Sequence, residues 1–228
     1  MNGRLFLLSP ANCGGARARQ LLSPRAASPL ASRLRSPEGV PLGELFAFVS
    51  ALYFRGKLSY ASRFARPPVV DDLVVGTGVR IITANAGLRP PTDGVRLADL
   101  EALAGIDISC DNHRFTDPLR QSAERLRDCV GPGAEVVLLG SVATPKYVDV
   151  LLAVFGRQLL FPMDFVGRGD MSRGGLLLRS VEAGAELSYV PLEGAIRHGR
   201  RPPKLPPVAR RADGVRARPI GQARGTRR

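Results

Sequence analysis

Two arginines in one glycine-rich segment are the residues of this sequence best suited to bind an anion. Arg168 and Arg173 lie with Asp170 and Ser172 in the segment 161–179, FPMDFVGRGDMSRGGLLLR. Glycines let a ligand approach the backbone closely, and guanidinium groups bind phosphate or carboxylate. The flanking apolar runs predict a strand, a polar loop and another strand. The segment is therefore an anion site, or a long hairpin whose arginines pair with its own aspartates or with water.

Few side chains in the sequence are suited to acid–base or nucleophilic catalysis. Asp164 and Asp170 flank the arginine loop and are the best general bases if the protein is an enzyme, unless they only orient the arginines. His113 and His198 are the only histidines, and neither belongs to an evident Ser-His-Asp or Cys-His pair. Cys13 is either a thiolate activated at a helix N-terminus or a buried small side chain.

Three polar loops follow predicted strands directly and hold the other candidates for ligand binding. The loop 9–15 carries two glycines before a helix, so it is either a phosphate or base cradle or a tight turn with a serine cap. The loops 85–91 and 140–146 come after the next two strands, and Thr144 fits a helix cap better than a catalytic role. The ligand-binding candidates in or beside these loops are Ser9, Asn12, Arg89, Ser141 and Tyr147.

Short apolar strands alternate with amphipathic helices along the chain. The expected strands are 4–8, 79–83, 134–139, 158–161, 174–181 and 186–190. The expected helices are 16–22, a short turn at 30–34, 42–64, 96–104, one that starts at Pro118 after an Asp117 cap, and 146–155. Gly56 is the expected break in the long helix. This order predicts a single α/β domain with a mixed, mostly parallel sheet, helices on both faces and antiparallel strands near the C-terminus.

The positive charge of the chain is concentrated in its last 32 residues. The net charge is +13 over 228 residues, of which residues 197–228 contribute +10 and residues 1–196 only +3. We therefore expect an α/β domain over 1–196 and a basic, Pro/Arg-rich tail over 197–228. The tail is too poor in large apolar residues to order itself, and its arginines would add salt-sensitive affinity for nucleic acid.

Cysteine usage and hydropathy indicate the compartment. Cys13, Cys110 and Cys129 are odd in number and widely spaced, which is not the pattern of a zinc site or of a disulfide framework. No apolar stretch approaches the roughly 20 residues that cross a bilayer. We expect a cytoplasmic protein with no membrane partner, no metal and no other cofactor.

Four motifs, in the same order, resemble those of the YaaA family of peroxide-stress proteins. The family's Leu-(Ile/Leu)-Ser-Pro-Ala-Lys motif resembles residues 7–12, and its Gly-x-Leu-Arg-Pro motif has a compressed counterpart at 87–90. Its Ser/Asp-x-x-Tyr turn resembles 141–147, and its Arg-Gly-x-Met-Ser-Arg motif matches 168–173. The resemblance spans about residues 4–180. It implies a mixed α/β fold whose loops line one positively charged cleft, and a role in DNA binding and protection from oxidative damage.

The sequence thus leads to a hypothesis with two alternatives. The leading hypothesis is a nucleic-acid or nucleotide-binding protein of YaaA-like fold, whose partner is nucleic acid or a phosphorylated small molecule. Arg168, Arg173 and Arg89 would contact phosphate, and Ser9 and Asn12 would lie near a sugar or base together with Tyr147. The first alternative is a hydrolase or glycosidase that acts on a nucleoside, a nucleotide or a nucleobase in DNA or RNA, with Asp170 or Asp164 activating water. The second is a scaffold that binds acidic partners through its tail.

Overall fold

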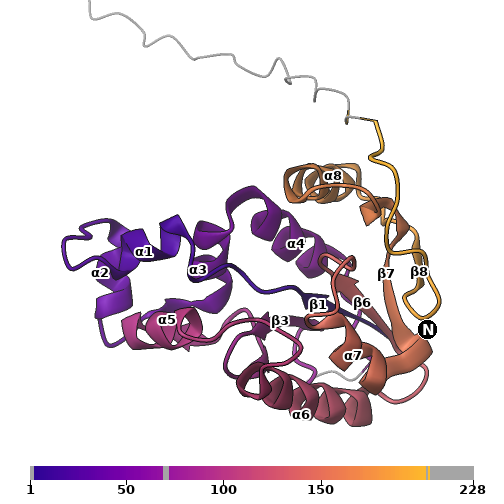
Figure 1. Cartoon of the computed structure of the whole chain (residues 1–228), viewed down its shortest axis with the longest axis horizontal. Coiled ribbons are helices and arrows are strands. Elements are labelled where there is room, and N and C mark those ends of the chain that lie inside the picture. Colours follow the sequence, from indigo (N-terminus) through magenta and orange to yellow (C-terminus); the bar gives the residue numbers. More distant parts are fainter. Residues whose placement is uncertain (1–2, 69–71, 204, 206–228) are drawn as a thin grey trace, which may run out of the picture.

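The computed structural model describes residues 3–68, 72–203 and 205, and its centre is a six-stranded sheet (Figure 1). The strand order is β4-β3-β1-β6-β7-β8. The strands are β1 (Arg4–Leu8), β3 (Val79–Thr83), β4 (Gly87–Arg89), β6 (Glu135–Leu139), β7 (Leu159–Pro162) and β8 (Tyr189–Pro191). The four inner strands pair in parallel, and β4 and β8 are antiparallel edge strands. The predicted mixed, mostly parallel sheet is confirmed.

Helices cover both faces of this sheet (Figure 1). They are α1 (Ala16–Leu22), α2 (Pro29–Arg35), α3 (Leu42–Val49), α4 (Ala51–Phe64), α5 (Leu97–Ala104), α6 (His113–Val130), α7 (Val148–Phe155) and α8 (Asp170–Ala183). Two short 3-10 turns flank β7, η1 (Gly156–Gln158) and η2 (Met163–Phe165), and a small antiparallel sheet pairs β2 (Val40–Pro41) with β5 (Gly94–Val95).

The central strand β1 shows why the sheet needs helices on both sides. Successive side chains of a strand point to opposite faces. Phe6 and Leu8 pack in the core beneath α4 and α8, whereas Leu5 and Leu7 pack in the core beneath α6 and α7. All four side chains are fully buried, so an unbroken apolar run is the pattern that this position demands.

The main error in the predicted elements concerns the segment after β7. Residues 174–181 form part of helix α8, not a strand. The buried positions Arg173, Gly174, Leu177 and Ser180 recur at helical spacing, but the two adjacent glycines resemble a turn in the sequence. The segment 161–179 is therefore strand, turn and helix, and the hairpin alternative is wrong.

Four smaller corrections concern helix and loop boundaries. The long helix breaks at Ser50, next to Ala51 with its positive φ of 45°, and Gly56 lies inside α4. Helix α6 starts at His113 after an Asn112 cap, so Pro118 lies in its second turn rather than at its start. The expected loop 85–91 contains β4, because its backbone pairs with β3 across a tight turn at a positive-φ glycine, Gly87. Helix α7 begins two residues later than predicted, after Tyr147.

The close approach of α4 and α8 explains two of the glycines. A Cβ atom on Gly56 would lie 2.8 Å from the carbonyl oxygen of Gly174, and one on Gly174 would lie 2.9 Å from the Cα of Tyr53. No other pair of helices is in such extensive contact within the described residues. This packing fixes the start of α8 beside the middle of α4.

The residues after β8 lack helix and strand as far as the structure describes them, up to 203 and at 205. Part of this segment lies against the loop before α8, where Arg168 Nη1 donates to the carbonyl oxygen of Pro203 at 3.4 Å. The tail was predicted to be disordered over 197–228, and residue 204 and residues 206–228 of it lie outside the described residues. Within the described residues, no helix is long and apolar enough to cross a membrane.

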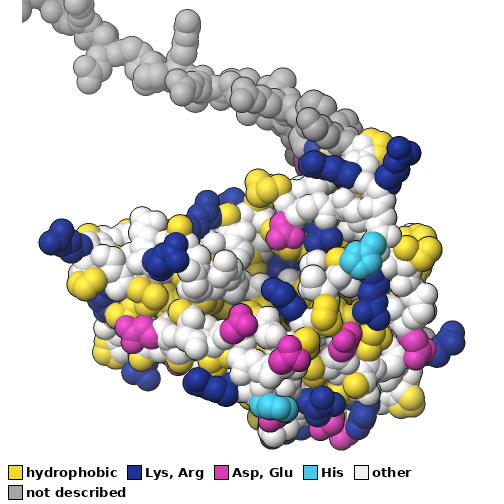
Figure 2. All heavy atoms as spheres, viewed as in Figure 1, with side chains coloured by type: hydrophobic (Ala, Val, Ile, Leu, Met, Phe, Trp, Pro, Cys, Tyr) yellow, Lys and Arg dark blue, Asp and Glu magenta, His cyan; other side chains and the backbone are white. Residues whose placement is uncertain are grey.

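Basic and acidic side chains are interspersed on the face shown in Figure 2. This mixture agrees with the small net charge of residues 1–196, because no single sign of charge dominates that face.

Candidate functional site

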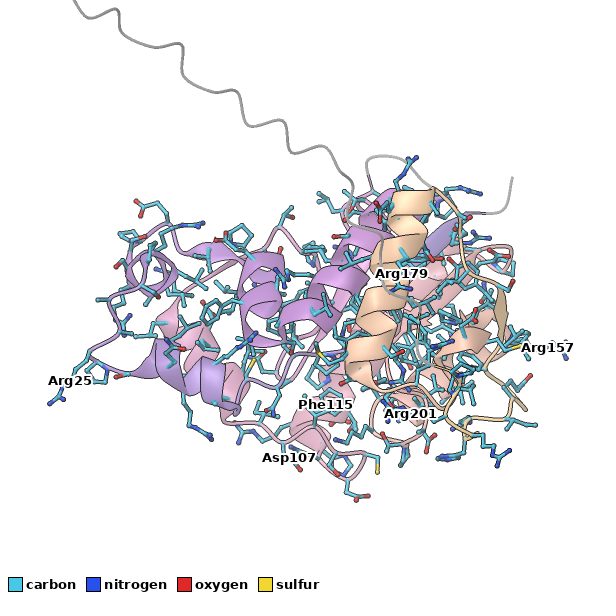
Figure 3. The ribbon with its side chains drawn as sticks, turned by 90° about the horizontal axis from the view of Figure 1, so that it is seen from above. Arg25, Asp107, Phe115, Arg157, Arg179 and Arg201 are labelled. Atoms are coloured by element: carbon cyan, nitrogen blue, oxygen red, sulfur yellow. The ribbon has the colours of Figure 1, made fainter. Side chains whose placement is uncertain are left out.

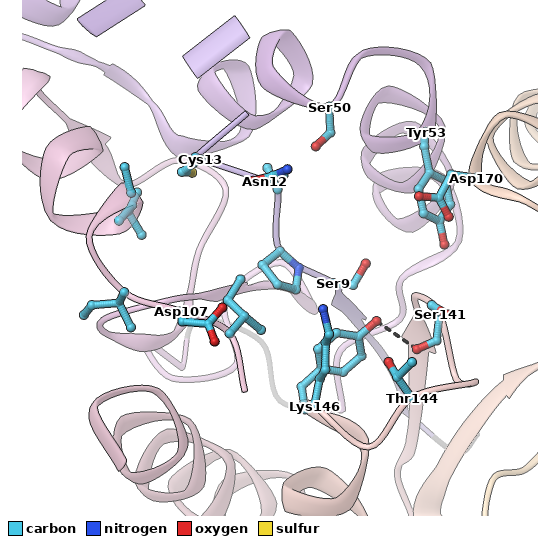
Figure 4. Close-up of a pocket in the computed structure, with 18 of the residues that line it drawn as sticks. Ser9, Asn12, Cys13, Ser50, Tyr53, Asp107, Ser141, Thr144, Lys146 and Asp170 are labelled. Atoms are coloured by element: carbon cyan, nitrogen blue, oxygen red, sulfur yellow. Dashed lines mark hydrogen bonds between the residues drawn. The ribbon is translucent and has the colours of Figure 1, made fainter. Parts of the chain in front are cut away.

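A polar pocket of about 970 Å³ opens at the carboxyl ends of β1 and β6 (Figure 4). Ligands of open α/β sheets bind at this edge, and pockets for small molecules span about 300–1,000 Å³. The loops after β1 and β6, the helix α4, the loop after α5 and the start of α8 all contribute to the lining. The polar side chains of the lining come from Ser9, Asn12, Ser50, Tyr53, Lys57, Asp107, Ser141, Thr144, Lys146, Tyr147 and Asp170.

The buried amine of Lys57 is a pocket residue that the sequence analysis missed. Its Nζ donates hydrogen bonds to the backbone oxygen of Ser9 at 2.7 Å and to the Ser9 Oγ at 2.8 Å. The side chain is 1% exposed, and no carboxylate of the described residues lies within ion-pair distance. Burial lowers the pKa of Lys57 to about 7, with Asp170 opposing this shift and Arg173 adding to it.

A sequence signal for Lys57 does exist. It shares the buried face of α4 with Tyr53, Tyr60 and Phe64, at helical spacing, and it is one of three lysines in the chain. The rings of Tyr53 and Phe54 lie 4.6 and 4.8 Å from its Nζ. A lysine at an apolar position of an amphipathic helix indicates a candidate functional site, because the burial of a charged group is costly.

Tyr147 and Gly140 hold the loop after β6 close to Ser9. The Tyr147 hydroxyl donates to the carbonyl oxygen of Ser141 at 2.8 Å, the bond drawn in Figure 4. Burial raises the pKa of Tyr147 to about 12, and the neighbouring Ser9 hydroxyl lowers it in part. A Cβ on Gly140 would lie 2.7 Å from the Ser9 Cβ, so glycine is required for this approach. The hydroxyl of Tyr147 therefore makes a structural hydrogen bond that holds this loop.

The Tyr53 hydroxyl is buried without a hydrogen-bond partner among the described residues. It lines the pocket, and burial raises its pKa above the usual range, while Arg173 acts in the opposite direction. A buried polar atom without a partner costs about 1–3 kcal/mol. Tyr53 therefore offers a hydrogen-bond donor to a ligand.

The structure brings some of the predicted site residues together and separates the rest. Ser9, Asn12, Ser141, Tyr147 and Asp170 line the pocket, and the first and third polar loops meet there. Arg89 lies on the edge strand β4 and pairs with Asp93 at 2.9 Å. Asp164 is exposed and lines none of the larger pockets, and its backbone oxygen accepts from Arg168 Nε.

Arg173 is buried and holds the start of α8 in place. Its Nε and Nη2 donate to the carbonyl oxygen of Phe165 at 3.2 and 3.1 Å, and its Nη1 lies 3.3 Å from an oxygen of Asp170. The side chain is 8% exposed, so its guanidinium is not open to an anion beside that of Arg168. The two arginines of the motif therefore have different surroundings.

A second, smaller groove of about 320 Å³ runs along α8 and contains three arginines. We call it the arginine groove after Arg168, Arg179 and Arg201; Ser172 also lines it, and Figure 3 shows Arg179 and Arg201 beside α8. Among the described residues, no carboxylate lies within ion-pair distance of these guanidiniums. Met171 lines both the groove and the pocket, so the two adjoin at the start of α8.

Cys13 also lines the pocket, but its environment does not favour a thiolate. The side chain is buried, and burial raises the pKa of Cys13 to about 12. Of the two predicted alternatives, the buried small side chain is the one that the structure supports.

Fold and site together define an α/β protein with a polar pocket at the carboxyl edge of a largely parallel sheet and an arginine groove beside it. Comparisons of the chain with models of protein families, with curated proteins and with solved structures found no match. The resemblance to the YaaA family stays a prediction from the motifs.

Proposed function

We propose that this protein binds a nucleotide, free or within a nucleic-acid strand, with the base and sugar in the pocket and the phosphate in the arginine groove. The observation that carries the proposal is the shared wall at Met171, which joins a pocket of nucleotide size to three guanidiniums that no carboxylate neutralises in the described residues. Guanidinium groups are well suited to bind phosphate through paired hydrogen bonds.

The charge of the pocket supports this division of roles. Its ionisable lysines and carboxylates are Lys146, Asp107, Asp170 and Lys57, whose pKa burial lowers to about 7, so the lining has no excess of positive charge. Carboxylates accept hydrogen bonds from sugar hydroxyls, and the amide of Asn12 suits a base edge. A phosphate would gain more from the arginine groove, where only cationic side chains carry charge.

Titrations of matched ligands test the proposal. Adenosine, AMP and a fluorescein-labelled single-stranded oligonucleotide are titrated into the wild type, Asn12→Ala and Arg168→Ala/Arg179→Ala, with Arg25→Ala, at an exposed position in the α1–α2 turn, as the control. Asn12→Ala should weaken all three ligands, whereas the double variant should weaken AMP and the oligonucleotide but not adenosine. No binding of any ligand, or equal losses for adenosine and AMP in the double variant, would refute the proposal.

Hydrolysis of the bound nucleotide is a second candidate, favoured by the position of Asp170. Its carboxylate lines the pocket, and Arg173 lies 3.3 Å away, where it orients the group that would activate water. The other predicted base, Asp164, lies outside the pocket. Incubation with nucleosides, nucleotides and damaged DNA should release base or phosphate from the wild type and not from Asp170→Asn. Equal release by both proteins, or none by either, would count against this candidate.

A further inference from the structure

Ser9 and Lys57 have the arrangement of a nucleophile and its base. Ser9 is the first residue after β1 and lines the pocket, and the Lys57 Nζ lies 2.8 Å from its Oγ. We propose that Ser9 and Lys57 are a catalytic pair that hydrolyses a carboxylic ester through an acyl-serine intermediate. This reaction goes beyond ligand binding, and it does not require the ester to contain a nucleotide.

The hydrogen bonds of Lys57 suit both of its protonation states. As an ammonium ion, it donates to the backbone oxygen and to the Oγ of Ser9. As a neutral amine, it can still donate to the backbone oxygen, which leaves its lone pair directed at the Oγ and ready to accept the hydroxyl proton. The backbone bond thus fixes the amine while the proton moves, as the third group of a catalytic triad does.

The surroundings of Lys57 favour the neutral amine. The groups that face it are Tyr53 on its own helix, Asp170 and Arg173 of α8, and Ser9. Burial lowers the pKa of Lys57 to about 7 and Arg173 acts in the same direction, whereas Asp170 opposes them. A lysine needs this kind of burial to act as a base near neutral pH.

Tyr53 is the donor that we assign to the developing oxyanion. Its hydroxyl is buried, lines the pocket and has no partner among the described residues, and its ring lies 4.6 Å from the Lys57 Nζ. A tyrosine hydroxyl in a water-poor site stabilises negative charge on an ester oxygen in the transition state. The site therefore contains a nucleophile, a base and an oxyanion donor.

The reaction proceeds in two balanced steps. In the first, the Ser9 Oγ bonds to the ester carbonyl carbon while its proton passes to the Lys57 Nζ. The bond from carbon to the alcohol oxygen breaks, and that oxygen leaves with the electron pair and takes the proton from Lys57. In the second, a water molecule gives a proton to Lys57 and attacks the acyl-serine carbon, and Ser9 leaves and recovers that proton. The products are a carboxylic acid and an alcohol.

Labelling with a fluorophosphonate, which modifies activated serines, tests the pair without knowledge of the natural ester. Intact-mass and peptide analysis should show one adduct, on Ser9, and the labelling rate should rise with pH through a midpoint near 7. Ser9→Ala should abolish the adduct, and Lys57→Met should slow labelling about 100-fold or more, the lower range for general-base catalysis. The exposed Ser32→Ala is the matched control and should label like the wild type.

Hydrolysis of p-nitrophenyl acetate supplies the second measurement, and Tyr53→Phe should slow it about 10-fold or more because the oxyanion loses its donor. An absence of labelling, an adduct on another serine, or a rate that stays flat between pH 5.5 and 8.5 in the wild type would overturn the proposal. The pH profile decides the question even if Lys57→Met does not fold. Nucleotide binding can fail while Ser9 labels normally, so failure of the proposed function is distinguishable.

Discussion

Gly56 of α4 and Gly174 of α8 face each other at the crossing of the two helices, and a Cβ on Gly56 would lie 2.8 Å from the Gly174 carbonyl oxygen. The contact places Asp170 and Met171, at the start of α8, in the same pocket lining as Lys57. The pocket depends on this approach of two helices that are more than 100 residues apart in sequence.

Gly56→Ala should lower the free energy of unfolding by up to about 2 kcal/mol in urea denaturation. Alanine favours a helix by about 1 kcal/mol over glycine, but the backbone of α8 must move to make room, at a cost of about 1–3 kcal/mol. The matched control is Gly175→Ala, whose added Cβ meets only Leu205 at 3.7 Å. It should stabilise the protein by up to about 1 kcal/mol. Equal effects of the two substitutions would contradict the close packing.

The stability of the wild type should rise with pH because of Lys57. Its pKa is about 7 in the folded protein and 10.5 as the ordinary value, so the unfolded chain binds more protons between these values. Unfolding therefore becomes harder as the pH rises through 7. Between pH 6 and 9, Lys57 should contribute an increase of about 2–3 kcal/mol.

Lys57→Met provides the comparison for this pH dependence. Chemical denaturation of both proteins at several pH values should show the rise in the wild type and a smaller one in the variant, because the other titrating groups are common to both. Parallel curves for the two proteins would show that Lys57 titrates normally in the fold.

Arg173→Met should destabilise the fold more than Arg168→Ala does. The guanidinium of Arg173 is buried and donates to the backbone of Phe165, so its loss leaves a carbonyl oxygen unsatisfied and should cost about 1–3 kcal/mol of stability. Arg168 lines the arginine groove and its hydrogen bonds to the backbone oxygens of Asp164 and Pro203 are exposed, so its loss should cost less, about 1 kcal/mol at most. Thermal denaturation measures both, and a reversed order would disprove these assignments.

The cysteines should differ in reactivity toward iodoacetamide. Cys110 is exposed, whereas Cys13 is buried and burial raises its pKa to about 12. Peptide mapping after brief treatment of the native protein at pH 8 should show Cys110 modified and Cys13 protected. Denaturant should make the two cysteines equally reactive. Fast modification of Cys13 in the native protein would instead support the alternative in which Cys13 is an activated thiolate.

Removal of residues 206–228 should reduce the salt dependence of oligonucleotide binding. This segment carries seven arginines and one aspartate, and each phosphate contact makes the negative slope of log K against log salt steeper by about 0.7 for a single strand. The shortened chain keeps Arg168, Arg179 and Arg201 of the groove. A fluorescence anisotropy titration at several salt concentrations measures the slope, and an unchanged slope would exclude a role for the tail.

The sequence predicted those parts of the fold that depend on local pattern. The buried runs at 4–8 and 79–83 could be assigned to strands because a sheet covered on both faces needs continuous apolar residues. Helix α8 could not, since Gly174 and Gly175 are poor helix formers, and the place of Gly174 depends on the opposing surface of α4.

The site was predictable where it depends on sheet topology. Ser9 and Ser141 follow parallel strands that are neighbours, so their loops meet. The contact of Lys57 with Ser9 joins residues 48 positions apart, and no local pattern specifies it. The burial of Arg173 likewise depends on how α8 packs, which the motif around it does not show.

The outer strands of the sheet have a consequence for self-association. Both β4 and β8 are three residues long, so each offers few free backbone groups to a strand from another molecule. The amide of Leu88 in β4 donates to Ser122 of α6, and Pro191 at the end of β8 has no amide proton to donate. Both edges are therefore poor templates for the intermolecular β-pairing that begins aggregation.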